Sequence, residues 1–461
     1  MVLLMLRQRL NYMKQLSLFP EEQDQVGTDS LDTSAWGTFK DSLKAPIHSW
    51  FTYPAGFSYK AVEFSIKQCT IQPLEVIYDP FMGSGTTNVV AKKFGVSSYG
   101  CDAHPFVFRI AQAKLNWDLE IKEVTKAIKQ LFLLIDENKE KIKDTTILDE
   151  IFPELVIKCY HKSSLFDLLL IRDSLLNSDI SSEIKEFLLV SLTHVLRQVS
   201  TAATGWPYIA PSKIKVTSQN KDVFSEFKIN SFKMVKDIEI MLREVDKNFL
   251  LSEHHLLNID SKNTERFIQG NSIDHIFTSP PYLNNYDYAD RTRLEMYFWG
   301  DAKNWADLTQ QVRRKLMTSA TTQTSRGDSR YILSQEIQDH APNIYNFLES
   351  AIEKLGTIRL TKGGKKNYDL VVAGYFNDIF EVLKDCYRVL KPGKKAIFVL
   401  GDSAPYGVHI PTDELIGELG VVVGFSSYKI DILRQRGDKW QKNPQRHTEK
   451  LRESIVTLTK E

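Results

Sequence analysis

The sequence predicts an α/β fold, in which a doubly wound sheet carries helices on both faces and a largely helical insertion interrupts it. Short apolar strands alternate with helical segments between residues 59 and 101, as in β-α-β units. A glycine-containing turn over residues 79–87 lies where the first strand meets its helix. Residues 118–250 then change texture and become rich in lysine and leucine at helical spacing, which predicts the insertion.

Each element of this fold has a local signal in the sequence. A helix is expected over residues 59–70, because Tyr59, Val62, Ile66 and Cys69 recur at helical spacing. Strands are expected at 74–78, 98–101, 255–259, 275–277 and 396–400, and helices at 88–94 and from 371 onward. Two further apolar runs, around Val421 and over 455–458, are expected to complete the sheet.

The changes of texture divide the chain into six segments. These are a polar N-terminal tail (1–40), a first part of the sheet domain (41–117), a helical insertion (118–254), a strand-and-loop segment (255–299), a basic insertion (300–369) and a C-terminal part of the sheet (370–461). Within the helical insertion, Gly205-Trp206-Pro207-Tyr208 breaks the pattern and predicts a loop.

The composition of the chain is that of an ordinary soluble globular protein. Of its 461 residues, 42% are hydrophobic and 25% are charged, and the formal net charge is +1. Any nucleic-acid surface must therefore come from local clustering of charge. The four scattered cysteines (Cys69, Cys101, Cys159, Cys386) show no metal-ligand spacing, so we expect reduced thiols, no metal and a cytoplasmic location. No apolar stretch approaches the ~20 residues of a membrane span, so no membrane partner is expected.

The glycine turn has the features of a cofactor loop. Gly83 and Gly85 permit a close approach of the backbone to a ligand, and the following helix start favours a carboxylate or phosphate. Asp102, after the next strand, is placed to accept hydrogen bonds from ribose hydroxyls. A merely structural glycine turn and a dehydrogenase loop both stay open, although Asn88 stands where the last glycine of a dehydrogenase motif would fall. A phosphate loop is excluded because no Gly-Lys-Ser/Thr follows.

A second motif, Thr278-Ser279-Pro280-Pro281-Tyr282, follows a short apolar strand. Two consecutive prolines lock the backbone and remove two N–H donors, which leaves a rim of carbonyl oxygens, the Ser279 hydroxyl and the Tyr282 ring. Such a rim suits a planar heterocycle that carries an amino group. The alternative is a purely structural proline turn at the end of a strand. This alternative is less favoured, because this motif and the glycine turn are both expected at the carboxyl edge of one sheet.

The pair of motifs at 79–87 and 278–282 resembles those of the amino-methylating DNA methyltransferases. The resemblance extends to residues 50–57, 387–393 and 401–403, and covers about half of the chain. It implies an enzyme that depends on S-adenosylmethionine and is built on a Rossmann-like sheet. Residues 41–117 would form the cofactor-binding half and residues 255–299 the catalytic segment. The Ser-Pro-Pro-Tyr form is typical of cytosine-N4 enzymes, whereas adenine-N6 enzymes usually carry Asp or Asn in place of the serine.

The resemblance also implies roles for individual residues. The catalytic residues would be Ser279, Pro280, Pro281 and Tyr282. The cofactor-binding residues would be Tyr53, Pro54, Asp79, Phe81, Gly83, Ser84, Gly85, Thr86, Thr87 and Asp102, with Asp260 as the candidate acid for the adenine of the cofactor.

The implied activity is site-specific methylation of cytosine N4 in duplex DNA, with the base flipped out of the helix. The family also implies a restriction–modification context and a cognate restriction endonuclease as a partner. Residues 303–366 hold eleven Lys/Arg against six acids, and 434–452 hold seven against two, so either region is a candidate for phosphate contacts or for a solvated face. The expected DNA-binding residues are Arg291, Arg293, Arg313, Arg314 and Lys315.

Several alternatives stay open at this point. The first is an adenine-N6 DNA methyltransferase. The second is an RNA base-amino methyltransferase, although we recognise no RNA-binding module. The third is a catalytically silent regulator that binds S-adenosylmethionine or DNA, which the intact Gly83, Gly85, Ser279 and Tyr282 disfavour. Either insertion is a candidate for reading the DNA. The loop at 205–208 is a candidate for facing the DNA or for burial in the core of its own insertion.

Overall fold

A computed structural model describes residues 33–53, 56–141, 147–203, 209–214, 221–436 and 450–461. Its centre is a seven-stranded sheet with the order β5-β2-β1-β6-β7-β9-β8. In that order the strands are β5 (His254–Leu257), β2 (Ser97–Cys101), β1 (Val76–Asp79), β6 (Ile273–Thr278), β7 (Leu390–Gly401), β9 (Leu451–Thr459) and β8 (Ser427–Arg436).

The strands from β5 to β7 pair in parallel, whereas β9 is antiparallel to both of its neighbours, β7 and β8. The chain adds strands outward from β1 through β2 to β5 on one side; on the other side β7 follows β6, β8 takes the edge, and β9 enters between β7 and β8. The boundary between β1 and β6 is therefore the switch point of the sheet, where doubly wound folds bind ligands beyond the carboxyl ends of the strands. The predicted Rossmann-like α/β class is confirmed.

Successive residues of the central strands point into two different cores, because side chains alternate along a strand. On one face, Ile77 and Phe277 pack with α2 (Tyr59–Gln68) and α3 (Thr86–Lys93). On the other face, Tyr78 and Ile276 share a core with the helices of the C-terminal half. These helices are α14 (Gln335–His340), α15 (Pro342–Thr361), α16 (Tyr368–Val389) and α17 (Thr412–Val423).

The run around Val421 was expected to be a strand and is the end of helix α17. Leu415, Ile416 and Leu419 are buried at helical spacing, which favours a helix over a strand here. Val421 itself is exposed. The strand of this region is β8 instead, and its largely exposed side chains give little alternation of polarity.

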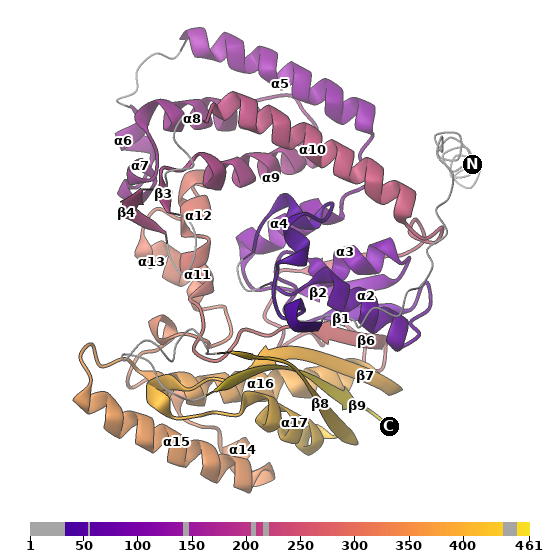
Figure 1. Cartoon of the computed structure of the whole chain (residues 1–461), viewed down its shortest axis with the longest axis vertical. Helices are drawn as coiled ribbons and strands as arrows, with labels where there is room; N and C mark the ends of the chain where they lie inside the picture. Colours follow the sequence, from indigo (N-terminus) through magenta and orange to yellow (C-terminus); the bar gives the residue numbers. More distant parts are fainter. Residues whose placement is uncertain (1–32, 54–55, 142–146, 204–208, 215–220, 437–449) are drawn as a thin grey trace.

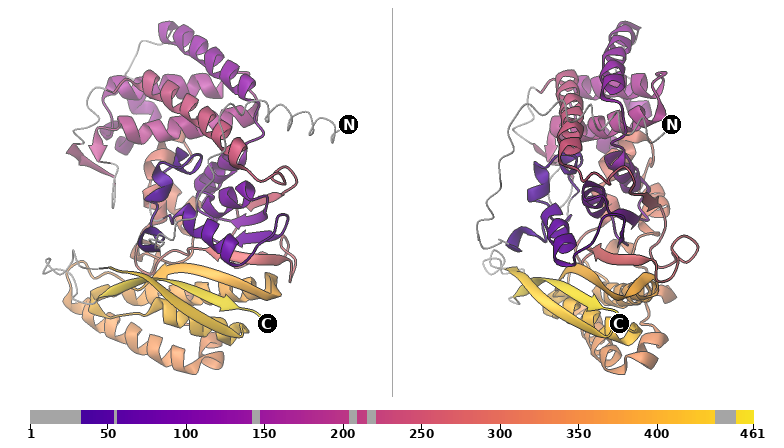
Figure 2. Two further views of the ribbon diagram at one scale, coloured as in Figure 1. Left: turned by 45° about the vertical axis from the view of Figure 1, so that its right-hand side comes forward. Right: turned by 90° about the vertical axis from the view of Figure 1, so that its right-hand side faces the viewer.

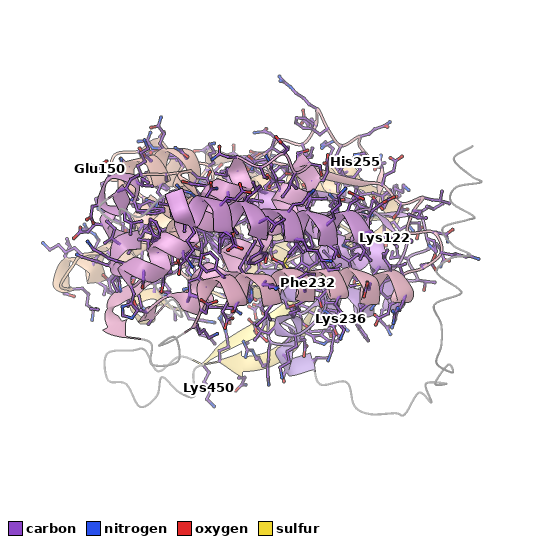
Figure 3. All side chains as sticks on the ribbon, turned by 90° about the horizontal axis from the view of Figure 1, so that it is seen from above. Lys122, Glu150, Phe232, Lys236, His255 and Lys450 are labelled. Carbon is purple, nitrogen blue, oxygen red and sulfur yellow. The ribbon has the colours of Figure 1, made fainter. Side chains whose placement is uncertain are left out.

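Residues 118–254 contain mainly helices: α5 (Ile121–Lys141), α6 (Leu148–Ile151), α7 (Glu154–Lys158), α8 (Lys162–Leu176), α9 (Ser182–Val199) and α10 (Val223–Glu244). A short pair of strands, β3 (Ala202–Ala203) and β4 (Ala210–Ile214), follows α9. Figures 1 and 2 show α5, α8, α9 and α10 at one end of the molecule, with β7, β8, β9 and α15–α17 at the other. Seen from above, α5 lies beside α10, and the exposed Lys122 and Lys236 lie on this outer layer (Figure 3).

This helical layer shares one continuous core with the first half of the sheet domain. Trp50 and helix α4 (Pro105–Leu115) pack into the same cluster as α8, α9 and α10. The Trp50 indole N–H also donates a hydrogen bond to Asp237 of α10 at 3.0 Å. Beyond β6, helices α11 (Tyr288–Arg291) and α12 (Arg293–Trp299) carry the chain from the sheet to the helical layer (Figure 1).

Residues 33–40 differ from the polar tail expected for 1–40. Trp36 and Phe39 are buried, because these aromatic side chains pack against the sheet domain rather than face solvent. Residues 1–32 lie outside the described part. No helix among the described residues is both long and apolar enough to cross a bilayer.

Candidate active site

The carboxylate of Asp79, at the end of β1, joins the two sequence motifs. It is fully buried and accepts hydrogen bonds from the Phe81 N–H at 3.0 Å, the Thr87 hydroxyl at 2.7 Å and the Thr278 hydroxyl at 2.6 Å. Burial raises the pKa of Asp79 to about 6, against the opposing effect of these donors. One carboxyl group therefore ties the loop after β1, the start of α3 and the end of β6 together.

The glycine loop adopts a conformation that its glycines permit. Gly83 and Gly85 have φ values of +52° and +83°, in the left-handed region. The Gly83 N–H donates to Asp102 at 3.0 Å, and the other carboxylate oxygen of Asp102 accepts from the His104 N–H at 2.8 Å. Burial raises the pKa of Asp102 to about 7. Asp102 thus braces the loop from the end of the neighbouring strand.

A pocket opens at this edge of the sheet. The loops that follow β1, β2, β5 and β6 all contribute to it, which is the arrangement expected at a switch point. Its lining includes ten of the site residues predicted from sequence: Tyr53, Phe81, Gly83, Ser84, Thr86, Asp102, Asp260, Ser279, Pro281 and Lys315. Phe57, from the segment 50–57 that shares the family resemblance, also lines the pocket, as do Ser261, Tyr288 and Met317, which were not predicted as site residues.

The other predicted site residues lie beside or behind this pocket. Asp79, Gly85 and Thr87 support the glycine loop from within, and a Cβ on Gly85 would lie 3.1 Å from that of Ala111. Pro280 is buried. Pro54 lies outside the described residues, as do residues 204–208, which contain the predicted loop.

The Ser279 hydroxyl has a defined hydrogen-bond role. It donates its proton to the Val399 carbonyl of β7 at 2.9 Å. Because a hydroxyl has one donor and two acceptor positions, the remaining lone pairs of this oxygen act only as acceptors. Ser279 and Pro281 both line the pocket, so this acceptor belongs to its wall.

Tyr282 is half-buried, and its ring is held by groups from the C-terminal strands. Its hydroxyl donates to Glu453 of β9 at 3.0 Å, and the Arg436 guanidinium lies 5.5 Å from the ring centroid. Burial, followed by the charge of Glu453, raises the pKa of Tyr282 well above its usual value. Glu453 was not predicted, because no local motif marks a residue so far along the chain.

A group of tyrosines continues from the pocket wall. The Tyr53 and Tyr288 ring centroids are 6.2 Å apart, and those of Tyr286 and Tyr288 are 6.0 Å apart. Burial raises the pKa values of Tyr53 and Tyr288, so both remain neutral hydroxyls. The alternation Tyr286-x-Tyr288 just after the proline motif was the available sequence signal.

The candidate DNA-binding residues divide into two groups. Arg313 has a side chain only 1% exposed, pairs with Asp287 at 2.8 Å and lies over Trp305. Arg291 is buried over Tyr286, and Arg293 pairs with Asp290 at 3.0 Å. These three guanidinium groups make internal contacts. Arg314 and Lys315 are exposed, and Lys315 also lines the pocket.

The acid expected near the cofactor adenine, Asp260, reaches the pocket wall after β5. It forms an ion pair with Lys262 at 3.3 Å, and Ile259 and Ser261 flank it in the lining. Among the described residues, no group of three or more His, Cys, Asp or Glu side chains is arranged to hold a metal ion.

Comparisons with known proteins place this site in context. Residues 7–113 match the N6/N4 methyltransferase family model, which is described as DNA methylase. The chain is 26% identical over 457 residues to the Type II methyltransferase M.BsoBI of Geobacillus stearothermophilus, which spans 92% of this chain and 87% of that protein.

Two further relatives have the same kind of name. The Type II methyltransferase M.MvaI of Kocuria varians is 24% identical over 453 residues, with 92% of each chain covered. M.AvaI of a Nostoc species, also a Type II methyltransferase, is 24% identical over 427 residues, covering 86% of this chain and 82% of that protein. The similarity therefore spans both motifs and both insertions.

Proposed function

Because the chain belongs to the amino-methylating DNA methyltransferase family, we propose that it methylates the N4 amino group of cytosine at a specific site in duplex DNA. The observation that carries this proposal is the Ser279 oxygen, an obligate acceptor at the wall of a pocket shared with the glycine loop. The restriction–modification context of the Type II relatives, with a cognate endonuclease as a partner, is part of the proposal.

The methyl donor proposed for the pocket is S-adenosylmethionine. The proposal is supported by the pocket lining, which combines the loops after β1, β2 and β5. Asp102 offers carboxylate oxygens for ribose hydroxyls, and Gly83 leaves room that a Cβ would close against the Tyr53 ring at 3.2 Å. Asp260 is proposed for the adenine end, where it lines the same pocket. When bound, the cofactor supplies an electrophilic methyl group.

The target amino group is proposed to lie against Ser279. Its nitrogen is a poor nucleophile, because the lone pair is delocalised into the ring. Acceptance of its N–H bonds by the Ser279 oxygen and by a carbonyl of the proline segment favours the pyramidal form, whose lone pair can attack. Pro280 and Pro281 carry no N–H, so they present no competing donor to this group. A strong base is not needed before attack, because the methylated product is acidic and loses its proton afterwards.

Tyr282 is proposed to stack on the flipped base. Removing a base from the duplex costs a few kcal/mol, and stacking on an aromatic side chain returns about 1–3 kcal/mol. The preference for cytosine rests on the serine at position 279, a neutral acceptor in the form typical of cytosine-N4 enzymes. Adenine-N6 methylation uses the same chemistry and is the outcome that would correct the base.

Phosphate contacts are proposed for Arg314 and Lys315. Both side chains are exposed close to the pocket, and their charges are free to meet a DNA backbone without loss of a buried partner. This narrows the five basic residues expected from sequence to two.

The decisive experiment is expression in a host that lacks DNA methylation, followed by nucleoside mass spectrometry of the host DNA. We expect N4-methylcytosine, and none with the variant Tyr282→Ala. N6-methyladenine in its place would overturn the choice of base. Methylated RNA nucleosides with unmodified DNA would overturn the choice of substrate, and the absence of both would contradict a methyltransferase.

A further inference from the structure

Three strands form a slot that receives the edge of Tyr282. Gly401 of β7 is paired with Glu453 of β9, and Glu453 is paired in turn with Arg434 of β8. Directly paired residues of adjacent strands project to the same face of a sheet. Gly401, Glu453 and Arg434 therefore form one row across the C-terminal strands, and the Tyr282 side chain enters this row from the loop after β6.

Glu453 is the centre of the slot. Its side chain is only 2% exposed, and its two oxygens have different partners. One oxygen accepts from the Tyr282 hydroxyl at 3.0 Å, and the other accepts from Arg434 Nε at 2.6 Å. A Cβ on Gly37 would collide with the same carboxyl group, so the backbone of the N-terminal segment closes over it. A carboxylate is tolerated at this depth because both oxygens are satisfied.

The remaining sides of the Tyr282 ring are also occupied. A Cβ on Gly401 would lie 3.2 Å from Tyr282 Cε2, so this edge of the ring lies close to β7. The Arg436 guanidinium covers one face of the ring at 5.5 Å from its centroid, and it is anchored by a 2.7 Å hydrogen bond to the Asp402 carbonyl. The hydroxyl, one edge and one face of this tyrosine are thus fixed by the C-terminal strands.

We propose that Glu453 is a positioning residue, which sets the orientation of the Tyr282 ring for stacking on the target base. This inference rests on the proposed function of Tyr282. A ring whose plane is fixed before the base binds stacks at a lower entropic cost, because a freely rotating ring loses conformational entropy on binding. Glu453 fixes the plane of the ring by accepting a hydrogen bond from the Tyr282 hydroxyl, the one polar group of that side chain.

The test compares Glu453→Ala, Tyr282→Phe and the double variant in single-turnover methylation of duplex DNA. Each single variant is expected to slow transfer roughly tenfold, as for loss of a hydrogen bond to a charged group. The double variant should be no slower than either single variant, because both remove the same contact. The affinity for S-adenosylmethionine should stay within about twofold of wild type, because that pocket contains neither residue.

Two variants make the test independent of stability. Glu453→Gln keeps an acceptor for the Tyr282 hydroxyl and should recover most of the rate. Asp431→Ala removes an exposed carboxylate of the same hairpin that pairs with Lys429 at the surface, and should leave the rate unchanged. Should Glu453→Ala fail to fold, Tyr282→Phe and Glu453→Gln still decide the matter.

The outcomes are distinct. Transfer by Tyr282→Phe at the wild-type rate overturns the positioning role, and so does a further loss when Glu453→Ala is added to Tyr282→Phe. A wild-type protein that methylates no DNA overturns the proposed function itself. An equal loss in Asp431→Ala would show that the hairpin acts through its stability alone.

Discussion

The Ser279 hydroxyl donates to the Val399 carbonyl across 2.9 Å, from the loop after β6 to the adjacent strand β7. This bond holds the serine proton at the sheet, so the oxygen can act as an acceptor at the pocket wall. Replacement by alanine removes the acceptor and leaves the pocket otherwise unchanged in shape.

We therefore expect Ser279→Ala to slow methyl transfer about 10- to 100-fold, with little change in cofactor affinity. Single-turnover rates and calorimetric titration with S-adenosylmethionine separate the two effects. Ser272→Ala is the matched control, since that hydroxyl also donates to a backbone carbonyl, at 2.6 Å from Gln269, but is absent from the pocket lining. Equal losses of rate and cofactor affinity in Ser279→Ala would argue against an acceptor role.

The raised pKa of Asp102, about 7, predicts that cofactor affinity depends on pH. Hydrogen bonds from ribose hydroxyls favour the ionised carboxylate, which predominates above that pKa, so protonation opposes binding below it. Affinity should rise from about pH 6 to about pH 8, by at most ~10-fold per pH unit. His104 adds nothing in this window, because burial lowers its pKa to about 3.

Asp102→Asn is the control for this pH dependence. It should bind the cofactor more weakly than wild type, with a flatter profile measured by titration calorimetry across the same buffers. Asp79, with its pKa of about 6, leaves a residual slope near the acidic end in both proteins. A wild-type affinity that is constant over the range would contradict a role for the Asp102 carboxylate in binding.

Arg314 and Lys315 are expected to contact DNA phosphates. Replacing either with glutamine should weaken binding to specific and unrelated duplexes alike, and should reduce the slope of log K against log salt by about one. Fluorescence anisotropy at several salt concentrations measures both quantities. Lys122→Gln, on the outer helical layer of Figure 3, is an exposed lysine control that should leave the slope unchanged. A slope unaffected by all three changes would place the DNA elsewhere.

Arg313 is expected to act on stability instead. Its ion pair with Asp287 is buried on both sides, at 1% and 4% exposure, and Asp287 also accepts from two N–H groups at the start of α11. Arg313→Ala should lower the free energy of unfolding by about 3–5 kcal/mol, because an unpaired carboxylate stays buried. Urea denaturation measures this loss.

The double variant Arg313→Ala with Asp287→Ala tests the cause. It should lose less stability than the sum of the single variants, since neither charge is then left alone. Additive losses would show that packing of the arginine over Trp305, at 4.2 Å, matters more than the ion pair.

The sequence by itself determined the sheet class and the two halves of the candidate site. Gly83 and Gly85, and the motif from Ser279 to Tyr282, are contiguous and directly follow apolar strands. Parallel strands present their carboxyl ends at one edge of a sheet. The proximity of two such motifs can therefore be predicted from the sequence, without information on long-range contacts. The helix over 59–68 and the strand at 76–79 were predictable for the same reason, since their periodicity lies within one element.

Only the tertiary structure decided which side chains serve the pocket and which serve its framework. Asp79 bridges two loops and Arg313 is buried against Asp287, and neither contact is visible in the sequence. Glu453 reaches Tyr282 across 171 residues of sequence. Such roles depend on burial and on partners brought together by the sheet, because a carboxylate or guanidinium acquires its function from the charges and donors that surround it in space.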